Sequence, residues 1–175
     1  MNLFYGYKTN GTYATNEEAS VVTGPNKLSM QAGDVRYVDN GDNIINESDK
    51  TIIGDPNPDI YGGIFGSLEV KNVQLSALFT YSVGNDIYNY VKYVSESMSD
   101  YSNQSTSVND RWTDGNTGAE IPKAVMGDPR GNSAFSDRWI EDGSYLMLKD
   151  LTISYVTPSW FNSIEINSIC YRINL

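Results

Sequence analysis

The 175-residue sequence contains no histidine and only one cysteine, Cys170. Without histidine, Ser-His-Asp and Cys-His catalysis are excluded, and the usual ligand of zinc and iron sites is missing. A single cysteine cannot form an internal disulfide, and no ligand cluster accompanies it, so we interpret Cys170 as a small packed apolar residue. The sequence also lacks any run of eighteen apolar residues, which excludes a transmembrane helix.

Basic residues are scarce, with 12 Lys and Arg against 22 Asp and Glu and a net charge of −10. Such a chain repels phosphate backbones, so we expect no nucleic-acid partner. The residues after Met1 have neither the basic start nor the apolar core of a signal peptide. At the other end, the strand-like residues 164–175 stop without a turn or a polar tail. We therefore expect an internal piece of a longer precursor.

The clearest pattern is the stretch 60–83, which predicts two strands joined by a tight turn. Lys71-Asn72 occupies the place of a two-residue hairpin loop, although the strongest loops of this type carry glycine. Strands of about ten residues with one apolar and one polar face are typical of transmembrane β-strands, and a soluble sandwich strand has the same pattern. In the second strand the odd positions are all apolar: Val73, Leu75, Ala77, Phe79, Tyr81 and Val83.

The remaining segments favour an all-β fold. In the strand predicted over residues 138–157, Leu151, Ile153 and Tyr155 share one face. Residues 99–137 are rich in Ser, Asn, Asp, Gly and Pro and predict a long polar loop. Short turns on one side and a long loop on the other are the asymmetry of an outer-membrane barrel. We expect antiparallel strands forming part of a transmembrane β-barrel, with long extracellular loops containing short helical turns.

Shorter elements are expected along the rest of the chain. They are extended pieces at 3–15, 33–38, 51–54 and 164–175, helical turns at 15–19 and within 88–98, and turns at Asn10-Gly11 and Pro158–Asn162.

An acidic loop is the first candidate site. Asp39, Asp42 and Asp49 lie in a segment that resembles a calcium-binding loop, in which carboxylates alternate through a tight glycine turn. This copy is one residue short after Asp39, and Asn43 replaces the glycine of the sharp turn. Two interpretations stay open: a bound calcium ion, or a hydrogen-bonded acidic turn without metal.

Aromatic residues of the long loop form a second candidate group. They either stack on sugar rings or peptide side chains, or pack as an interfacial girdle. We predict no catalytic residue and no enzyme activity, because neither Glu17/Glu18 nor Glu141/Asp142 lies in an identifiable cleft. The candidates for ligand or partner contact are Tyr88, Tyr90, Trp112 and Trp139, with Tyr93 and Tyr101 beside them.

Residues 33–59 resemble a signature of the SusC/RagA family, the TonB-linked outer-membrane transporters of the Bacteroidetes. The resemblance extends over residues 1–175, and it covers only the C-terminal part of such a barrel. The plug domain, the TonB-contacting segment and most barrel strands are absent. Further motifs agree in order: residues 4–11, the Gly-Gly hairpin at 62–83, residues 84–89, residues 111–113 and residues 139–155.

The resemblance implies import of oligosaccharide or peptide fragments, driven by TonB through the absent plug and covered by a SusD-like surface lipoprotein. The apolar strand faces would contact the lipid bilayer, the polar faces would line the lumen, and residues 84–142 would face the ligand and the lipoprotein. The alternative is a soluble extracellular β-sandwich that binds carbohydrate and holds structural calcium. A truncated gene product without a function of its own is a third interpretation.

Overall fold

The computed structural model describes residues 3–156 and 168–174, and the chain divides into two compact units. The first, here called the loop unit, comprises residues 1–56 and 86–142. The second, the strand unit, comprises residues 57–85 and 143–175. The chain therefore passes from one unit to the other three times, and each unit is described by itself.

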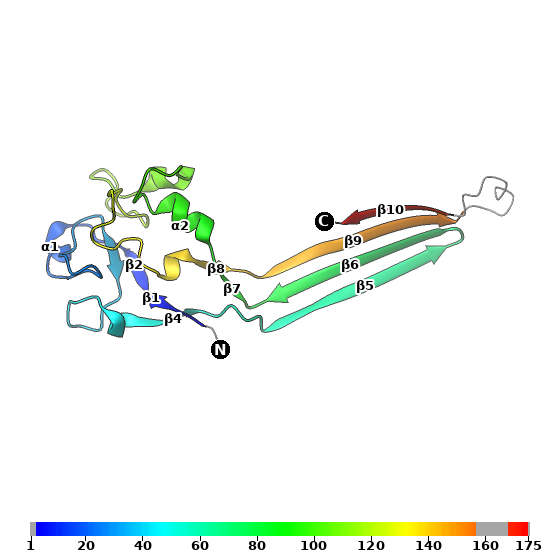
Figure 1. Cartoon of the computed structure of the whole chain (residues 1–175), viewed down its shortest axis with the longest axis horizontal. Coiled ribbons are helices and arrows are strands. Elements are labelled where there is room, and N and C mark those ends of the chain that lie inside the picture. Colours follow the sequence, from blue (N-terminus) through cyan, green and yellow to red (C-terminus); the bar gives the residue numbers. More distant parts are fainter. Residues whose placement is uncertain (1–2, 157–167, 175) are drawn as a thin grey trace. The chain divides into compact units, whose positions relative to one another are not determined.

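The strand unit is one antiparallel sheet. Its strands are β5 (Ile60–Val70), β6 (Val73–Val83), β9 (Tyr145–Val156) and β10 (Ser168–Asn174), in the order β10-β9-β6-β5 (Figure 1). Each strand lies beside the next strand of the same unit along the chain. The unit is thus an up-and-down meander, with residues 86–142 inserted between β6 and β9.

The predicted hairpin is confirmed in register and in loop length. Val70 pairs with Val73, which leaves Lys71 and Asn72 as the two-residue loop. Lys71 takes the left-handed conformation at φ 55°, a conformation that glycine adopts at lower cost. Asn72 compensates by bonding the end of β9: its side-chain amide donates to the Val156 carbonyl, and its own carbonyl accepts from the Val156 N–H, both at 2.8 Å.

The loop unit is built from short elements. Its described strands pair as β1 with β4, β2 with β3 and β7 with β8, all antiparallel. The strands are β1 (Phe4–Tyr7), β2 (Thr9–Thr12), β3 (Val35–Tyr37), β4 (Lys50–Gly54), β7 (Asp86–Tyr88) and β8 (Ile140–Asp142). The helices are α1 (Asn16–Ala19) and α2 (Tyr90–Glu96), with 3₁₀ turns at Glu47–Asp49, Thr106–Asp110 and Asp137–Trp139.

The loop unit has a hydrophobic core of its own. Tyr7 and Tyr37 pack with ring centroids 5.2 Å apart, and the Tyr37 hydroxyl donates to the Gly131 carbonyl at 2.6 Å. Burial raises the pKa of Tyr37 far above its ordinary value, so the phenol stays protonated and available as this donor. The core residues are Tyr7, Tyr13, Ala19, Val22, Met30, Val35, Tyr37 and Ile45.

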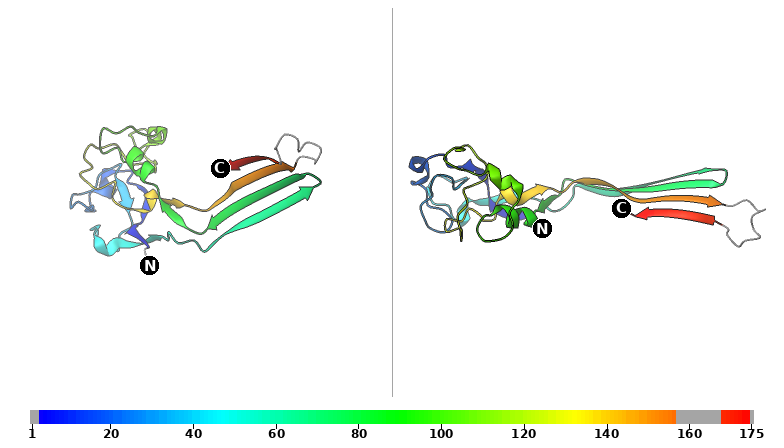
Figure 2. Two further views of the ribbon diagram at one scale, coloured as in Figure 1. Left: turned by 45° about the vertical axis from the view of Figure 1, so that its right-hand side comes forward. Right: turned by 90° about the horizontal axis from the view of Figure 1, so that it is seen from above.

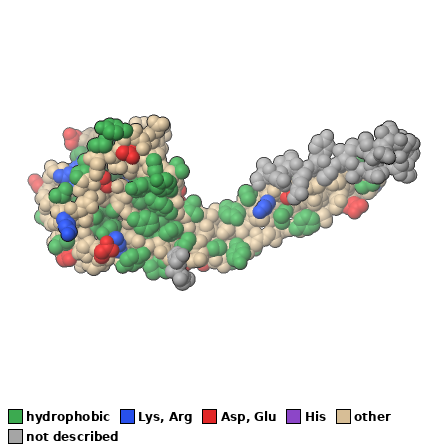
Figure 3. Space-filling view, in the orientation of Figure 1, with side chains coloured by type: hydrophobic (Ala, Val, Ile, Leu, Met, Phe, Trp, Pro, Cys, Tyr) green, Lys and Arg blue, Asp and Glu red, His purple; other side chains and the backbone are tan. Residues whose placement is uncertain are grey.

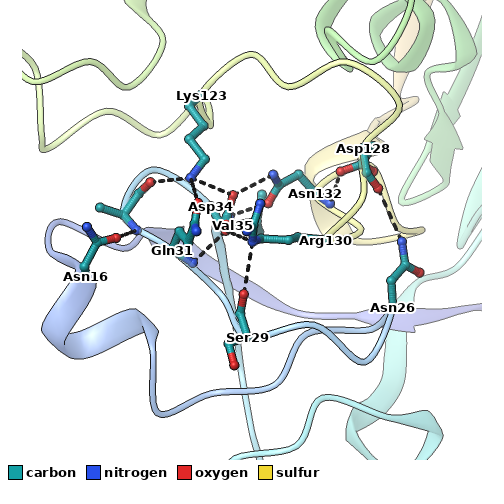
Figure 4. Close-up of polar contacts among 11 residues, drawn as sticks. Asn16, Asn26, Ser29, Gln31, Asp34, Val35, Lys123, Asp128, Arg130 and Asn132 are labelled. Carbon is teal, nitrogen blue, oxygen red and sulfur yellow. Dashed lines mark hydrogen bonds and ion pairs between the residues drawn. The ribbon is translucent and has the colours of Figure 1, made fainter.

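A buried carboxylate joins the two halves of the loop unit. Asp34 is fully buried, with Lys123 Nζ at 3.4 Å and Arg130 Nε at 3.6 Å (Figure 4). Its oxygens also accept the Gln31 N–H at 2.7 Å and the Asn132 amide at 3.0 Å. A buried charge is tolerated only when it is paired and hydrogen-bonded in this way. Residues 99–137, expected as a long polar loop, therefore contain anchored segments of a packed unit.

Neither α1 nor α2, nor any other helix among the described residues, is long and apolar enough to span a membrane. The turn expected at Pro158–Asn162 lies outside the described residues, as does the side chain of Cys170.

Candidate functional site

The strand unit carries one continuous apolar face. The register places Leu75 between Leu68 and Ile153, and Phe79 between Ile64 and Leu148. An irregularity between Leu78 and Phe79 adds one residue to β9, and the alternation continues beyond it on the same face. This apolar face comprises Ile60, Gly62, Ile64, Gly66, Leu68 and Val70 of β5, Val73, Leu75, Ala77, Phe79, Tyr81 and Val83 of β6, and Leu146, Leu148, Leu151, Ile153 and Tyr155 of β9.

No layer covers this face within the described part of the strand unit. Leu75, Phe79 and Ile153 are 40%, 39% and 46% exposed. Figure 2 shows the unit as a single sheet, with no second sheet packed against it among the described residues. A contiguous exposed apolar surface of this kind marks a membrane or protein contact. The sandwich alternative requires a covering sheet, and the described residues supply none.

The length of the strands fits a bilayer. β6 has eleven residues, which at about 3.3 Å per residue gives about 36 Å along the strand. At the tilt of about 40° typical of membrane barrels, this corresponds to about 28 Å across the membrane, close to the apolar band of about 25 Å in outer-membrane barrels.

The opposite face is mostly polar. Gln74 and Ser76 of β6 lie opposite Ser154 and Thr152 of β9, and the Asp150 carboxylate accepts the Thr152 hydroxyl at 2.8 Å. The exceptions include Leu78 and Phe65, which lie opposite each other in the middle of this face, and Met147 beside Thr80. The two faces of the sheet therefore suit two different environments, one apolar and one aqueous.

A tyrosine packs over a glycine on the apolar face. A Cβ atom placed on Gly62 would lie 2.9 Å from the Tyr81 hydroxyl oxygen and 3.1 Å from Tyr81 Cζ. The absence of a side chain at Gly62 thus lets the ring of its cross-strand neighbour approach the backbone closely.

In the acidic loop, carboxylates accept backbone N–H groups. Asp39 Oδ2 accepts from Gly41 N at 2.9 Å and from Asn43 N at 3.0 Å, and Asp42 Oδ1 accepts from Ile44 N at 2.9 Å. Asn43 adopts the left-handed conformation at φ 59°, as its place at the sharp turn predicted.

Asp49 closes the same loop from its other end. Its Oδ1 accepts from Asn40 N at 3.0 Å, and its Oδ2 accepts from Asn46 N at 2.8 Å as half of a capping box. Within residues 3–156 and 168–174, no three Asp, Glu, His or Cys side chains are grouped to hold a metal. A calcium ion at Asp39, Asp42 and Asp49 stays a prediction.

Several of the aromatic residues predicted for ligand contact belong to one cluster. Tyr88 lies 6.3 Å from Tyr90 and 5.4 Å from Phe135, measured between ring centroids, and Tyr93 stacks on Tyr90 at 5.9 Å. Partial burial raises the pKa of Tyr88, and the neighbouring Tyr93 and Tyr90 add to the rise. Tyr90 is 62% exposed, and Figure 3 shows apolar side chains gathered on this face of the loop unit.

The two predicted tryptophans lie inside the loop unit. Trp139 is fully buried; its Nε1–H donates to the Ala134 carbonyl at 3.1 Å and its ring meets Tyr93 edge-on at 5.3 Å. Trp112 packs on Gly33, where an added Cβ would lie 2.6 Å from the indole ring. The structure thus brings Tyr88, Tyr90 and Trp139 together through Tyr93, and it places Trp112 elsewhere. Ligand contact by these residues stays a prediction.

Glu141, one of the carboxylates considered for catalysis, occupies a structural position. Glu141 Oε2 accepts from Asn89 Nδ2 at 2.8 Å, and its Oε1 pairs with Lys92 Nζ at 3.1 Å. The bond from Asn89, followed by that from Lys92, lowers the pKa of Glu141. Asn89 also caps α2 by accepting the Lys92 N–H at 2.8 Å, so Glu141 joins β8 to the start of this helix.

Sequence reasoning missed one pocket in the loop unit. It has a volume of about 480 Å³ and takes residues from separate segments of the chain, without a local motif. Its lining consists of Thr9, Asn10, Gly11, Lys92, Glu96, Glu120, Ile121 and Arg138.

Comparison with known proteins places this geometry in context. No protein-family model matches the chain. TonB-dependent receptor P3 of Formosa agariphila is 31% identical over 161 residues, covering 90% of this chain and 15% of the receptor. TonB-dependent receptor P26 of the same organism is 33% identical over 165 residues, covering 89% and 16%.

Solved structures share the fold. The RagAB peptide transporter has a TM-score of 0.71 at 20% identity, covering 99% of this chain and 19% of the transporter chain. The RagAB peptide importer in its closed-closed state has a TM-score of 0.62 at 21% identity, with 99% and 20% covered.

The chain is a SusC/RagA-like segment of a TonB-dependent receptor. It spans about 15% of the length of the curated receptors it matches. The expected class of fold, antiparallel strands belonging to a barrel, is confirmed, and so is the expected outer-membrane location. The proteins to which this receptor segment is similar are receptors and transporters rather than enzymes.

Proposed function

We propose that this receptor segment forms part of the wall of an outer-membrane importer of peptide or oligosaccharide fragments. The observation that carries the proposal is the uncovered apolar face of β5, β6 and β9 with a mostly polar face behind it. On this proposal the apolar face contacts lipid and the polar face lines the lumen.

The partners are part of the same proposal. TonB would act through a plug domain outside residues 1–175, and a SusD-like surface lipoprotein would cover the extracellular side. The similarity to the RagAB peptide transporter and peptide importer supports peptides as one substrate class. The segment would act without catalysing a reaction, because its role is to separate lipid from the transported solute.

Two adjacent residues of β6 give the direct test. Leu75 lies on the apolar face and Ser76 on the polar face, at the same depth along the strand. In the complete receptor, with Cys170→Ser as background, single cysteines would replace Leu75 or Ser76. We expect Ser76→Cys to react with a small water-soluble maleimide, and Leu75→Cys to react only with a lipid-soluble one.

The transport activity has its own readout. Cells that lack the receptor gene should lose TonB-dependent uptake of fluorescent peptide or oligosaccharide, and the cloned gene should restore it. Equal labelling of the two cysteines by the water-soluble reagent would contradict the assignment of the faces. Unchanged uptake of both substrate classes without the gene would contradict import.

A further inference from the structure

Arg138 lines the pocket of the loop unit, and among the described residues no carboxylate lies within ion-pair distance of it, although carboxylates such as Glu96 of the same pocket act on its charge from farther away. Its Nη1 donates to the Asn132 carbonyl at 3.0 Å, and its guanidinium carbon lies 4.6 Å from the centre of the Trp139 ring. None of the ion pairs among the described residues includes Arg138. Burial lowers the pKa of this arginine from its ordinary value, which reflects the cost of removing the charge from water.

An arginine in this position is oriented to bind an anion. The planar guanidinium presents five N–H donors in a fixed fork, and the carbonyl of Asn132 takes a bond from only one of its nitrogens. The buried Trp139 ring supports one side of the guanidinium and restricts its orientation. A carboxylate in the pocket would add a directly bonded counter-charge through two parallel hydrogen bonds.

The other charges of the pocket limit the kind of anion. Glu96 and Glu120 line the same pocket, and they would repel a ligand with several negative charges. Glu96 Oε1 accepts the Ser107 hydroxyl at 2.6 Å, whereas Glu120 is exposed. Lys92, the second cation, is already paired with Glu141. The pocket therefore suits a small ligand that carries one carboxylate and one ammonium group.

We infer that this pocket binds the free carboxylate of a short zwitterionic peptide at Arg138, with the ammonium group toward Glu96 and Glu120. The volume of about 480 Å³ lies within the usual range of small-ligand sites, about 300–1,000 Å³. The inference deepens the proposed function by selecting peptides over neutral oligosaccharides as the ligand of the loop unit.

The test compares four probes on the complete receptor, purified in detergent, by isothermal titration calorimetry. They are tri-alanine, tri-alanine amide, N-acetyl-tri-alanine and a digalacturonate. We expect tri-alanine to bind about ten- to a hundredfold more tightly than its amide, because the amide cannot form the charged bonds with Arg138. The acetylated peptide should bind more weakly than tri-alanine, and the digalacturonate more weakly still.

Substitutions test whether Arg138 causes the preference for tri-alanine over its amide. Arg138→Gln should reduce the difference between tri-alanine and its amide to about twofold or less. Arg138→Lys keeps the charge but loses the fork, so it should retain part of the preference. Arg111→Gln is the matched control, because Arg111 also donates Nη1 to a carbonyl, that of Val108, and lies outside the pocket.

Each outcome decides for or against the inference. Equal binding of tri-alanine and its amide by the unmodified receptor, or an undiminished preference in both Arg138 variants, would overturn it. Failure of tri-alanine to bind at millimolar concentration would do the same. Arg138-dependent binding of the digalacturonate as tight as that of tri-alanine would assign the pocket to acidic sugars instead. Cellular uptake is measured separately, so a negative binding result would not contradict the transport proposal.

Discussion

The loop unit and the strand unit place their apolar residues in opposite ways. The loop unit buries Tyr37, Met30 and Trp139 in its own interior, as soluble domains do. The strand unit presents its apolar face to its surroundings, with Leu68 62% and Leu146 72% exposed. The same chain thus combines a region stabilised by its own core with a region whose apolar side chains have no covering layer among the described residues.

The largest expected effect concerns the buried charge of the loop unit. Asp34→Ala removes the partner of Lys123 and Arg130, and we expect a loss of about 3–5 kcal/mol in the stability of this unit. Hydrogen exchange of the complete receptor should show faster exchange across the loop unit and little change in β5 and β6. The control, Glu47→Gln, removes an exposed ion pair with Lys50 and should cost less than about 1 kcal/mol. A loss shared equally by both units would contradict their independence.

A second pair of substitutions tests the strand unit by its unfolding free energy. Phe79→Lys places a charge on the apolar face near the middle of β6, and we expect a cost of about 2–4 kcal/mol when the receptor folds in lipid vesicles. Thr80→Lys, one residue away on the polar face, should change the unfolding free energy much less. Urea titration in vesicles measures both. Similar costs at the two positions would mean that the faces do not meet different solvents.

The packing of Tyr81 on Gly62 predicts that two glycine substitutions in β5 differ in their effect on the unfolding free energy. This difference should be smaller than that between the two faces of β6. Gly62→Val should cost about 1 kcal/mol, because the added side chain displaces the Tyr81 ring. Gly66→Val is the matched control on the same face, since nothing lies within 4 Å of a Cβ placed on Gly66. We expect the control to be neutral or slightly stabilising, because valine has less freedom than glycine in the unfolded chain. Equal effects of the two substitutions in the same urea titration would show that Tyr81 does not contact Gly62.

The link between β8 and α2 predicts that the local stability of the loop unit, but not of the strand unit, depends modestly on pH. The folded-state pKa of Glu141 is lowered, so its contribution is present at neutral pH and disappears as the pH falls through the range in which the carboxylate is protonated. Amide exchange in α2 should therefore become faster at acidic pH in the unmodified receptor than in Glu141→Gln, after normalising each protein to its rate at neutral pH. Parallel pH profiles of the two proteins would argue against this link.

The acidic loop predicts the smallest effect. Backbone N–H groups bind Asp39 Oδ2, Asp42 Oδ1 and both oxygens of Asp49, so the interpretation as a metal-free acidic turn predicts no saturable heat when millimolar calcium is titrated into the receptor. The calcium hypothesis requires the opposite result, a saturable heat that Asp42→Asn weakens. Calorimetry of the two proteins distinguishes the interpretations.

Residues 60–83 show how much a local pattern can predict. The alternation from Val73 to Val83 and the two-residue loop at Lys71-Asn72 specified both strands and their register. The helical turn at 15–19 was equally local, because Thr15 accepts the Glu18 N–H at 3.4 Å as an N-cap. Such features depend on residues a few positions apart, and their side-chain chemistry is visible in the sequence.

Residues 99–137 have contacts that a local sequence pattern does not predict. Their polar composition predicted a loop, but Lys123 and Arg130 reach Asp34, about 90 positions earlier in the chain. The burial of Trp139 and the joining of Lys92, Glu120 and Arg138 in one pocket also depend on segments that are separated in the chain. Polar residues follow no helix or strand period in these segments, so their partners cannot be found from spacing.

The sequence by itself determined that the long strands have two unlike faces, because successive side chains of a strand must point to opposite sides of the sheet. Only the tertiary structure decided which aromatic rings are buried, which carboxylate holds the loop unit together, and where an arginine is left facing a pocket. Those features arise from contacts between distant segments, and burial gives each contact its energy.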